Sequence, residues 1–144
     1  YFIPDESLAD VVKIAALSGI DVRIMIPNKP DHPFVYWATY SYVGSMLEAG
    51  AKIYVYNNGF LHAKTIMVDG KIASVGTANI DVRSFRLNFE VNAFMYSKDV
   101  TQRLLADFER DMSQSDLLTL EAYQQRSIWI QIKESIARLI SPIL

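Results

Sequence analysis

The dipeptide Asp69-Gly70 separates two stretches of alternating apolar residues, and it constrains the fold more than any other feature of the sequence. Asp-Gly between two such stretches is a strong signal for a two-residue β-hairpin. The sequence therefore predicts strands over residues 60–68 and 71–75, with a third strand over residues 88–96. A hairpin of this kind brings an antiparallel pair into the fold, so an all-helical or purely parallel arrangement is excluded.

Helical and strand patterns alternate before the hairpin. Apolar residues at helical spacing follow Asp5, a predicted N-cap, and stop at Gly19. Further strands are predicted over residues 21–26 and 52–56, and further helices over residues 34–49 and 98–112. Together with the hairpin, this order predicts an α/β fold in which helices flank a mixed β-sheet.

Composition narrows the classes of function. The absence of cysteine among 144 residues excludes disulfides, thiolate chemistry and Cys-ligated zinc. A net charge of −2 supplies no general attraction to phosphate polymers, so nucleic acid is not an expected partner. No apolar run reaches the roughly 18 residues of a membrane-spanning helix. Because the chain opens with a short apolar strand rather than Met, we expect a fragment of a longer protein, itself soluble or peripheral.

The chain is expected to divide into a catalytic half over residues 1–114 and a helical extension over residues 115–144. The extension carries an apolar stripe of Trp129, Ile132, Ile136, Leu139, Ile140 and Ile143. Two interpretations stay open. The stripe packs on its own domain or on a missing part of the chain, as apolar helix faces usually do, or it lies on a bilayer surface.

A histidine and a lysine stand two positions apart, at His62 and Lys64, within the strand predicted over residues 60–68. Side chains alternate between the faces of a strand, so the imidazole and the ammonium are expected to project from one face. An imidazole can attack phosphorus or protonate a departing alkoxide, while a lysine holds phosphate oxygens. Asn79, after the flexible Gly76, adds an uncharged donor, so no metal or other cofactor is required.

Two carboxylates near this pair receive different interpretations. Glu90 belongs to a polar stripe with Asn88 and Asn92 in a strand otherwise suited to burial, where an unpaired carboxylate is costly. We expect Glu90 to accept a hydrogen bond from a ring nitrogen of His62 and to stabilise the imidazolium. Asp69 falls on the face opposite His62, and its place in an Asp-Gly turn is a sufficient structural reason for it.

This spacing resembles the HxKxxxxD(x6)G[ST]xN signature of the phospholipase D superfamily. The matching residues are His62, Lys64, Asp69, Gly76, Thr77 and Asn79. The likeness continues through residues 80–92, and with residues 1–5, 30–33 and 139–142 the chain resembles the C-terminal catalytic half of the bacterial cardiolipin synthases. By this resemblance His62 is one of two paired active-site histidines. Lys64 and Asn79 bind the phosphate, Glu90 supports the histidine, and Asp69 is the signature's aspartate.

The resemblance also implies a component that this sequence lacks. Members of the superfamily build one active site from two such motifs, in one chain or across a homodimer, with one histidine as nucleophile and the other as acid and base. His32, the sole other histidine, is followed by Pro33 and Phe34 with no lysine two residues on, and we interpret it as a loop residue. Lys29 and Asp31 in the same loop are either solvated or contact a glycerol headgroup.

The implied reaction is phosphatidyl transfer through a phospho-histidine, in which two phosphatidylglycerol molecules give cardiolipin and glycerol, with His62 as acid and base. The implied partners are phosphatidylglycerol, a membrane surface and a second motif-bearing half, and the full-length protein is expected at the bacterial cell membrane. Water as acceptor would make the site a phospholipase D, and a nucleic-acid diester would make it a nuclease, against which the pI of 5.6 speaks. Alone, the half could be a non-catalytic interaction module.

Overall fold

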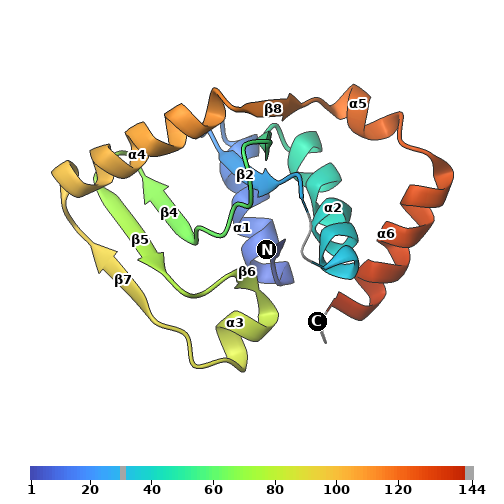
Figure 1. The fold of residues 1–144 in the computed structure, drawn as a ribbon, viewed down its shortest axis with the longest axis horizontal. Helices are drawn as coiled ribbons and strands as arrows, with labels where there is room; N and C mark the ends of the chain where they lie inside the picture. Colours follow the sequence, from blue (N-terminus) through green and yellow to red (C-terminus); the bar gives the residue numbers. More distant parts are fainter. Residues whose placement is uncertain (30–31, 142–144) are drawn as a thin grey trace.

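The computed structural model describes residues 1–29 and 32–141, and its strands form three small sheets (Figure 1). The strands are β1 (Phe2–Ile3), β2 (Arg23–Pro27), β3 (Lys52–Tyr56), β4 (Thr65–Val68), β5 (Ile72–Gly76), β6 (Ile80–Asp81), β7 (Asn92–Met95) and β8 (Ser115–Leu118). The helices are α1 (Glu6–Leu17), α2 (Pro33–Glu48), α3 (Val82–Arg86), α4 (Lys98–Met112), α5 (Leu120–Gln124) and α6 (Ile128–Ile140).

The sheets combine parallel and antiparallel pairs. Strand β1 runs parallel to β6, and β2 runs parallel to β3, which pairs on its other edge with the antiparallel β8. Strands β4, β5 and β7 form an antiparallel sheet in that order. The predicted α/β fold with mixed pairing and flanking helices is confirmed. The predicted N-cap is confirmed as well, because the Asp5 side chain accepts a hydrogen bond from the backbone N–H of Leu8.

The hairpin predicted at Asp69-Gly70 joins β4 to β5. Asp69 has a φ of 51° and Gly70 a φ of 61°, so both residues of the turn are left-handed, as a type I′ turn requires. The register places Val68 opposite Ile72 and Thr65 opposite Val75. Three residues, Asp69 to Lys71, therefore separate the paired strands, one more than the predicted two-residue loop, although the backbone N–H of Lys71 still donates to the carbonyl oxygen of Val68 over 3.0 Å.

Three predicted segments differ from the structure. The strand predicted over residues 60–68 begins at Thr65, and the strand predicted over residues 88–96 begins at Asn92. Both β4 and β7 pair with β5, and β5 ends at Gly76. The residues that precede β4 and β7 therefore have no strand to pair with. Residues 115–118, predicted inside a helical extension, form β8 because the open edge of β3 pairs with them, and such distant pairing overrides local pattern.

The main apolar core lies between α1, α2 and the β2–β3–β8 sheet. Ile26, Val43, Met46 and Ile53 are almost fully buried there. These side chains come from the alternate positions of the two parallel strands and from one side of α2. This core stabilises the part of the molecule that does not carry the motif. Strands β4, β5 and β7 extend away from it and lie beneath α4 (Figure 1).

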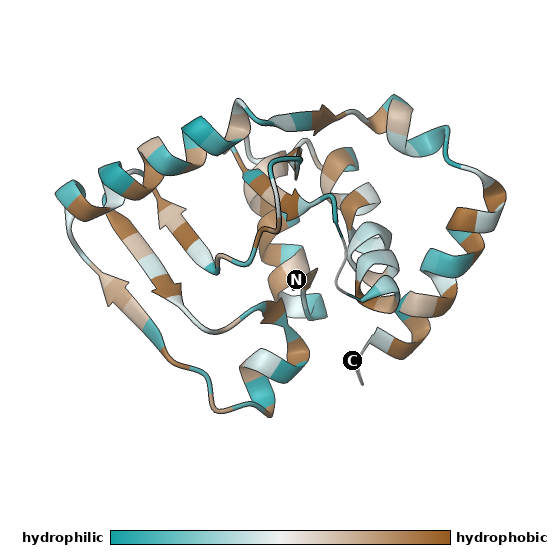
Figure 2. Cartoon of the chain, in the orientation of Figure 1, coloured by the Kyte–Doolittle hydropathy of each residue, from teal (hydrophilic) through white to brown (hydrophobic). Residues whose placement is uncertain are grey.

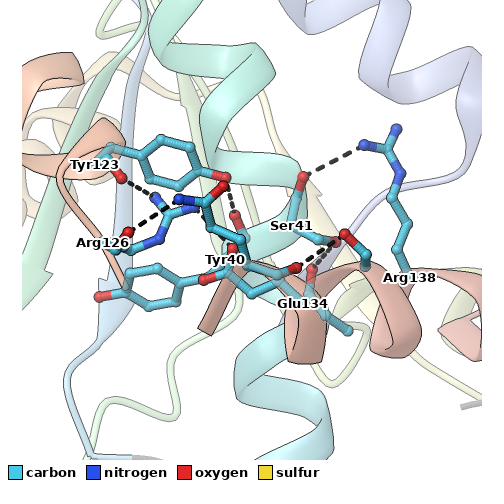
Figure 3. A network of polar contacts seen from close by, with 9 residues as sticks. Tyr40, Ser41, Tyr123, Arg126, Glu134 and Arg138 are labelled. Atoms are coloured by element: carbon cyan, nitrogen blue, oxygen red, sulfur yellow. Dashed lines mark hydrogen bonds and ion pairs between the residues drawn. The ribbon is translucent and has the colours of Figure 1, made fainter. Parts of the chain in front are cut away.

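Helix α6 packs on α2 through a narrow inner face (Figure 3). Ala137 is fully buried in this contact. Arg126 donates from Nη2 to Oε2 of Glu134 over 2.8 Å, and its guanidinium carbon lies 3.1 Å from the ring centroid of Tyr123. The Tyr123 hydroxyl donates to the carbonyl oxygen of Tyr40 over 2.8 Å. The ion pair and the cation–π contact thus link α6 through Arg126 to Tyr123 of α5, and the hydrogen bond of Tyr123 links α5 to α2.

The apolar stripe predicted on this helix points away from the described protein. Trp129 is 71% exposed, Ile136 52% and Leu139 83%, because the small Ala137 and its neighbours occupy the contact with α2. Packing of the stripe on the chain's own domain is therefore wrong for the described residues, and Ile143 lies outside them. Within residues 1–29 and 32–141 no helix is both long enough and apolar enough to cross a bilayer.

Glu134 gives the packing of α6 a measurable pH dependence. Burial raises its pKa above the ordinary 4.5, although Arg126 opposes the shift. A carboxyl with a raised pKa contributes stability that is present below 4.5 and is lost as the pH rises through the pKa of the folded state. We expect Glu134→Gln to flatten the change in the free energy of unfolding between about pH 4 and 7, measured by urea denaturation.

The control for this measurement is Ser135→Ala, which removes an exposed hydroxyl from the same helix. It should retain the wild-type profile. A Glu134→Gln variant whose free energy of unfolding varies with pH as in the wild type would contradict the expectation.

Candidate active site

His62 and Lys64 lie in the extended segment that leads into β4. The Nζ of Lys64 donates to the carbonyl oxygen of His62 over 2.8 Å, and the carbonyl oxygen of Lys64 accepts from the backbone N–H of Gly76 over 3.2 Å. The imidazole of His62 stacks on Phe60 with ring centroids 5.5 Å apart and is exposed. The ammonium is thus fixed against the backbone, while the imidazole stands at the surface, where another molecule can reach it.

The Gly-Thr-Ala part of the signature, residues 76–78, is hydrogen-bonded to the start of β7, and we call this contact the clasp. Thr77 donates its backbone N–H to the carbonyl oxygen of Val91 over 3.0 Å, and its Oγ1 accepts from the backbone N–H of Val91 over 2.9 Å. The Oδ1 of Asn92 accepts from the backbone N–H of Ala78 over 3.2 Å. A Cβ on Gly76 would collide with the Asn92 side chain and the Val91 carbonyl, so this close approach needs glycine.

Asn79 is held through its backbone. Its backbone N–H donates to Oγ of Ser84 over 3.2 Å, and the backbone N–H of Ser84 donates to Oδ1 of Asp81 over 2.7 Å. Within the described residues the Oδ1 of Asn79 is buried with no hydrogen-bond partner. The binding of a phosphate oxygen by the Asn79 amide stays a prediction.

Glu90 belongs to the same cluster. Hydrogen bonds from the side chains of Thr77 and Asn88, and the positive charge of Lys64, hold the pKa of Glu90 below its usual range. The bond from Asn88 joins Nδ2 to Oε1 over 3.0 Å. These groups favour the ionised form of the carboxylate, and the hydrogen bond from Thr77 is the largest of the effects.

The structure gathers some of the predicted site residues and leaves others apart. Lys64 and Glu90 share one cluster with Thr77 of the signature. The imidazole of His62 stacks on Phe60, and the carboxylate of Glu90 accepts a hydrogen bond from Asn88. Among the described residues, no hydrogen bond joins His62 to Glu90. The support of His62 by Glu90 stays a prediction.

Asp69 lies at the far end of the hairpin. Strand β4 rises about 3.3 Å per residue over its four residues, so the turn stands roughly 13 Å beyond the end at which Lys64 enters the strand. Asp69 is exposed and occupies the left-handed turn position. Its placement suits the structural interpretation given for the Asp-Gly turn.

The loop before α2 contributes less to the site. His32 occupies the N-cap position of α2 and Lys29 is exposed, while Asp31 lies outside the described residues. The contact of Lys29 and Asp31 with a headgroup stays a prediction. Among the described residues, no group of three or more His, Asp or Glu side chains is placed to hold a metal ion.

Sequence reasoning missed the residues that support the site from behind. Ser84 holds the backbone of Asn79, and Ser74 accepts from Nδ2 of Asn92 over 3.0 Å. Asp81 followed by Ser84 three residues later has the spacing of an N-cap, and that signal predicts the short α3 that places Ser84. Nothing local in the sequence indicates the role of Ser74, because it depends on the β5–β7 register.

Known protein families and proteins resemble this chain over most or all of its length. A family model described as "Cardiolipin synthase, PLD-like domain" matches residues 1–112. The chain is 68% identical over 144 residues to the cardiolipin synthase of Oceanobacillus iheyensis, a match that covers all of this chain and 30% of that protein. It is 66% identical to the major cardiolipin synthase ClsA of Bacillus subtilis, with the same coverage.

The fold has a solved counterpart in Nuc, a phospholipase D family member from Salmonella typhimurium. The TM-score is 0.70 at 18% identity, over 83% of this chain and 78% of that chain. The fold and the signature residues define a domain of the phospholipase D class. More narrowly, the chain belongs to the cardiolipin synthase PLD-like domain family, and it spans about 30% of the length of the curated relatives it matches.

We expect Asp69 to matter for the turn and not for chemistry. Asp69→Asn and Asp69→Gly keep residue types that tolerate the left-handed conformation, and both should retain activity. Asp69→Val should lower the free energy of unfolding by about 1–2 kcal/mol, since a β-branched residue is strained at positive φ. Urea denaturation and an activity assay measure the two effects. Loss of activity in Asp69→Asn with unchanged stability would show a catalytic role.

Gly76→Ala tests the clasp between the signature and β7. The added Cβ meets a backbone carbonyl, which cannot swing aside, so the β5–β7 register must shift. We expect activity to fall and the free energy of unfolding to drop by about 1–3 kcal/mol. Ala63→Ser, at an exposed position between the two motif residues, is the control. A Gly76→Ala protein with wild-type stability and turnover would contradict the role given to this contact.

Proposed function

We propose that this chain supplies one half of a phosphatidyltransferase site that makes cardiolipin from two phosphatidylglycerol molecules. The observation that carries the proposal is the identity of 68% and 66% to two cardiolipin synthases over the whole chain, with the signature residues in place. Lys64 and Asn79 bind the phosphate, and Glu90 supports the imidazole of His62. The full-length protein, which joins this half to a second motif-bearing half, should therefore convert phosphatidylglycerol to cardiolipin and glycerol.

The reaction needs two imidazoles in different roles. In the first step a ring nitrogen attacks phosphorus, a P–N bond forms, the P–O bond to glycerol breaks, and the leaving oxygen takes a proton. In the second step the hydroxyl of another phosphatidylglycerol loses its proton, its oxygen attacks phosphorus, and the P–N bond breaks. The exposed His62 is suited to give and then take the proton.

The nucleophile comes from a second motif-bearing half. His32 does not meet this need, because no lysine follows it two residues later, as the signature requires. The second half belongs to the same longer polypeptide or to a second copy in a homodimer. The whole protein works at a membrane surface, since both substrates are bilayer lipids.

The first experiment compares two histidines. We expect His62→Asn to lower cardiolipin formation from phosphatidylglycerol by about 10²–10⁴-fold, as loss of a general acid–base group does. His32→Asn is the matched control and should retain wild-type turnover. The assay follows cardiolipin by mass spectrometry, and circular dichroism confirms that both variants fold. Unchanged turnover in His62→Asn would refute the catalytic role and favour a non-catalytic interaction module.

The second experiment separates the substrate classes. The protein is offered phosphatidylglycerol vesicles and single-stranded DNA in parallel, each at low ionic strength. Cardiolipin with intact DNA supports the proposal, and phosphatidic acid without cardiolipin identifies a phospholipase D. Cleaved DNA without a lipid product would reverse the assignment in favour of a nuclease.

A further inference from the structure

Helix α6 carries a continuous apolar surface that the described protein leaves uncovered. This outer face consists of Ile128, Trp129, Ile132, Ile136 and Leu139, and each of these side chains is 43–83% exposed. They recur at intervals of three and four residues, so they form one stripe along the helix. The helix of 13 residues is about 20 Å long. Exposed apolar stripes of this extent mark contact surfaces.

The charges of α6 are distributed unevenly around this face. Lys133 and Arg138 are exposed and lie on its flanks. Glu134, the sole acidic residue of α6, is 4% exposed and is paired with Arg126 on the inner face (Figure 3). Arg138 also donates from Nη1 to the carbonyl oxygen of Ser41 over 3.4 Å, so the cations stand at the edges of the apolar face, beside α2, while the carboxylate is buried. An interfacial helix on an anionic lipid surface has this arrangement.

Aromatic groups extend the surface onto α2. The ammonium of Lys133 lies 5.1 Å from the ring centroid of Trp37, and Trp37 packs edge-on against Phe34 at 5.5 Å. Phe34 is 48% exposed. Together with Trp129 these rings provide the amphipathic aromatic groups that favour the headgroup region of a bilayer.

The outer face of α6 is also remote from the motif. In Figure 1 the β4–β5–β7 sheet and α6 lie at opposite ends of the molecule, with α2 and the β2–β3–β8 sheet between them. A second half that brings its imidazole to His62 must cover the segment that leads into β4. The hydropathy colouring shows apolar residues along α6, at the end of the molecule away from the β4–β5–β7 sheet (Figure 2).

We propose that the outer face of α6 lies in the interfacial region of an anionic phospholipid bilayer and docks this half of the site on the membrane. The proposal rests on the proposed function only for the choice of a lipid surface. The apolar side chains of the stripe enter the headgroup boundary, Lys133 and Arg138 contact lipid phosphates, and the Arg126–Glu134 pair holds α6 to the turn that precedes it.

Environment-sensitive labels test this directly, because the chain has no cysteine of its own. The intact protein, with any cysteine elsewhere replaced by serine, receives Leu139→Cys or the control Ala106→Cys, at an exposed position of α4 away from α6. Each thiol is labelled with a fluorophore that brightens in apolar surroundings. On addition of phosphatidylglycerol-containing vesicles, the emission at position 139 should shift to shorter wavelength and be quenched by nitroxide-bearing acyl chains. The label at position 106 should respond to neither.

Each outcome decides the proposal. No response at position 139 to any vesicle would overturn it. Blue-shifted emission at position 139 in the absence of lipid would overturn it as well, because another part of the protein would then cover the outer face of α6. If that shift grows with protein concentration, the covering surface belongs to a second copy. A shift with neutral phosphatidylcholine vesicles equal to that with phosphatidylglycerol vesicles would refute the role of Lys133 and Arg138.

Turnover distinguishes this proposal from the proposed function. Leu139→Asp should lower turnover on vesicles about tenfold, because a leucine that enters the lipid in the docked state is replaced by a charge. In detergent micelles, where no bilayer docking is needed, the same variant should retain wild-type turnover. Equal turnover of variant and wild type on vesicles would contradict docking through α6. A label response without any cardiolipin formation would leave docking intact and refute the enzyme assignment.

Discussion

The contact on which the site depends is the clasp between residues 76–79 and the start of β7. At Gly76 strand β5 leaves its partner β4, and the chain is caught at once by Val91 and Asn92 through backbone and side-chain hydrogen bonds. Only a residue without a Cβ allows this approach. Because Lys64 bonds the same Gly76 through its carbonyl oxygen, the clasp also fixes the distance between the lysine and the Thr77–Asn79 segment. Glycine in the signature is therefore required by packing before any chemistry is considered.

The charges around the clasp explain why the site is open on one side. Hydrogen bonds from Thr77 and Asn88, and the charge of Lys64, favour the ionised form of Glu90. The imidazole of His62 lies at the surface beside Phe60. In the proposed reaction, a group that exchanges protons with a lipid oxygen benefits from this exposure, and the nucleophile of the proposed second half approaches from the same side.

The sequence predicted most of the elements because local signals agreed with the final contacts. Asp5, Gly19 and Asp69-Gly70 each mark a boundary through backbone geometry that needs no distant partner. The predictions were wrong where distant pairing decides. Strand β8 exists because β3 has an open edge, and residues 60–64 are not a strand because β5 ends at Gly76. For the same reason Lys64 and Asn79 could be found from their spacing, whereas Ser74 and Ser84 could not.

The extension shows why a hydrophobic stripe is weak evidence for a core. On α6 the contact with α2 uses Ala137 and the paired Glu134, since a small side chain and a neutralised charge permit close approach. The large apolar residues are thereby turned outward. An apolar helix face indicates that another surface covers it, and the flanking charges indicate the chemistry of that surface. With its one carboxylate inside and its cations at the edge, α6 is complementary to an anionic surface and would oppose a basic one.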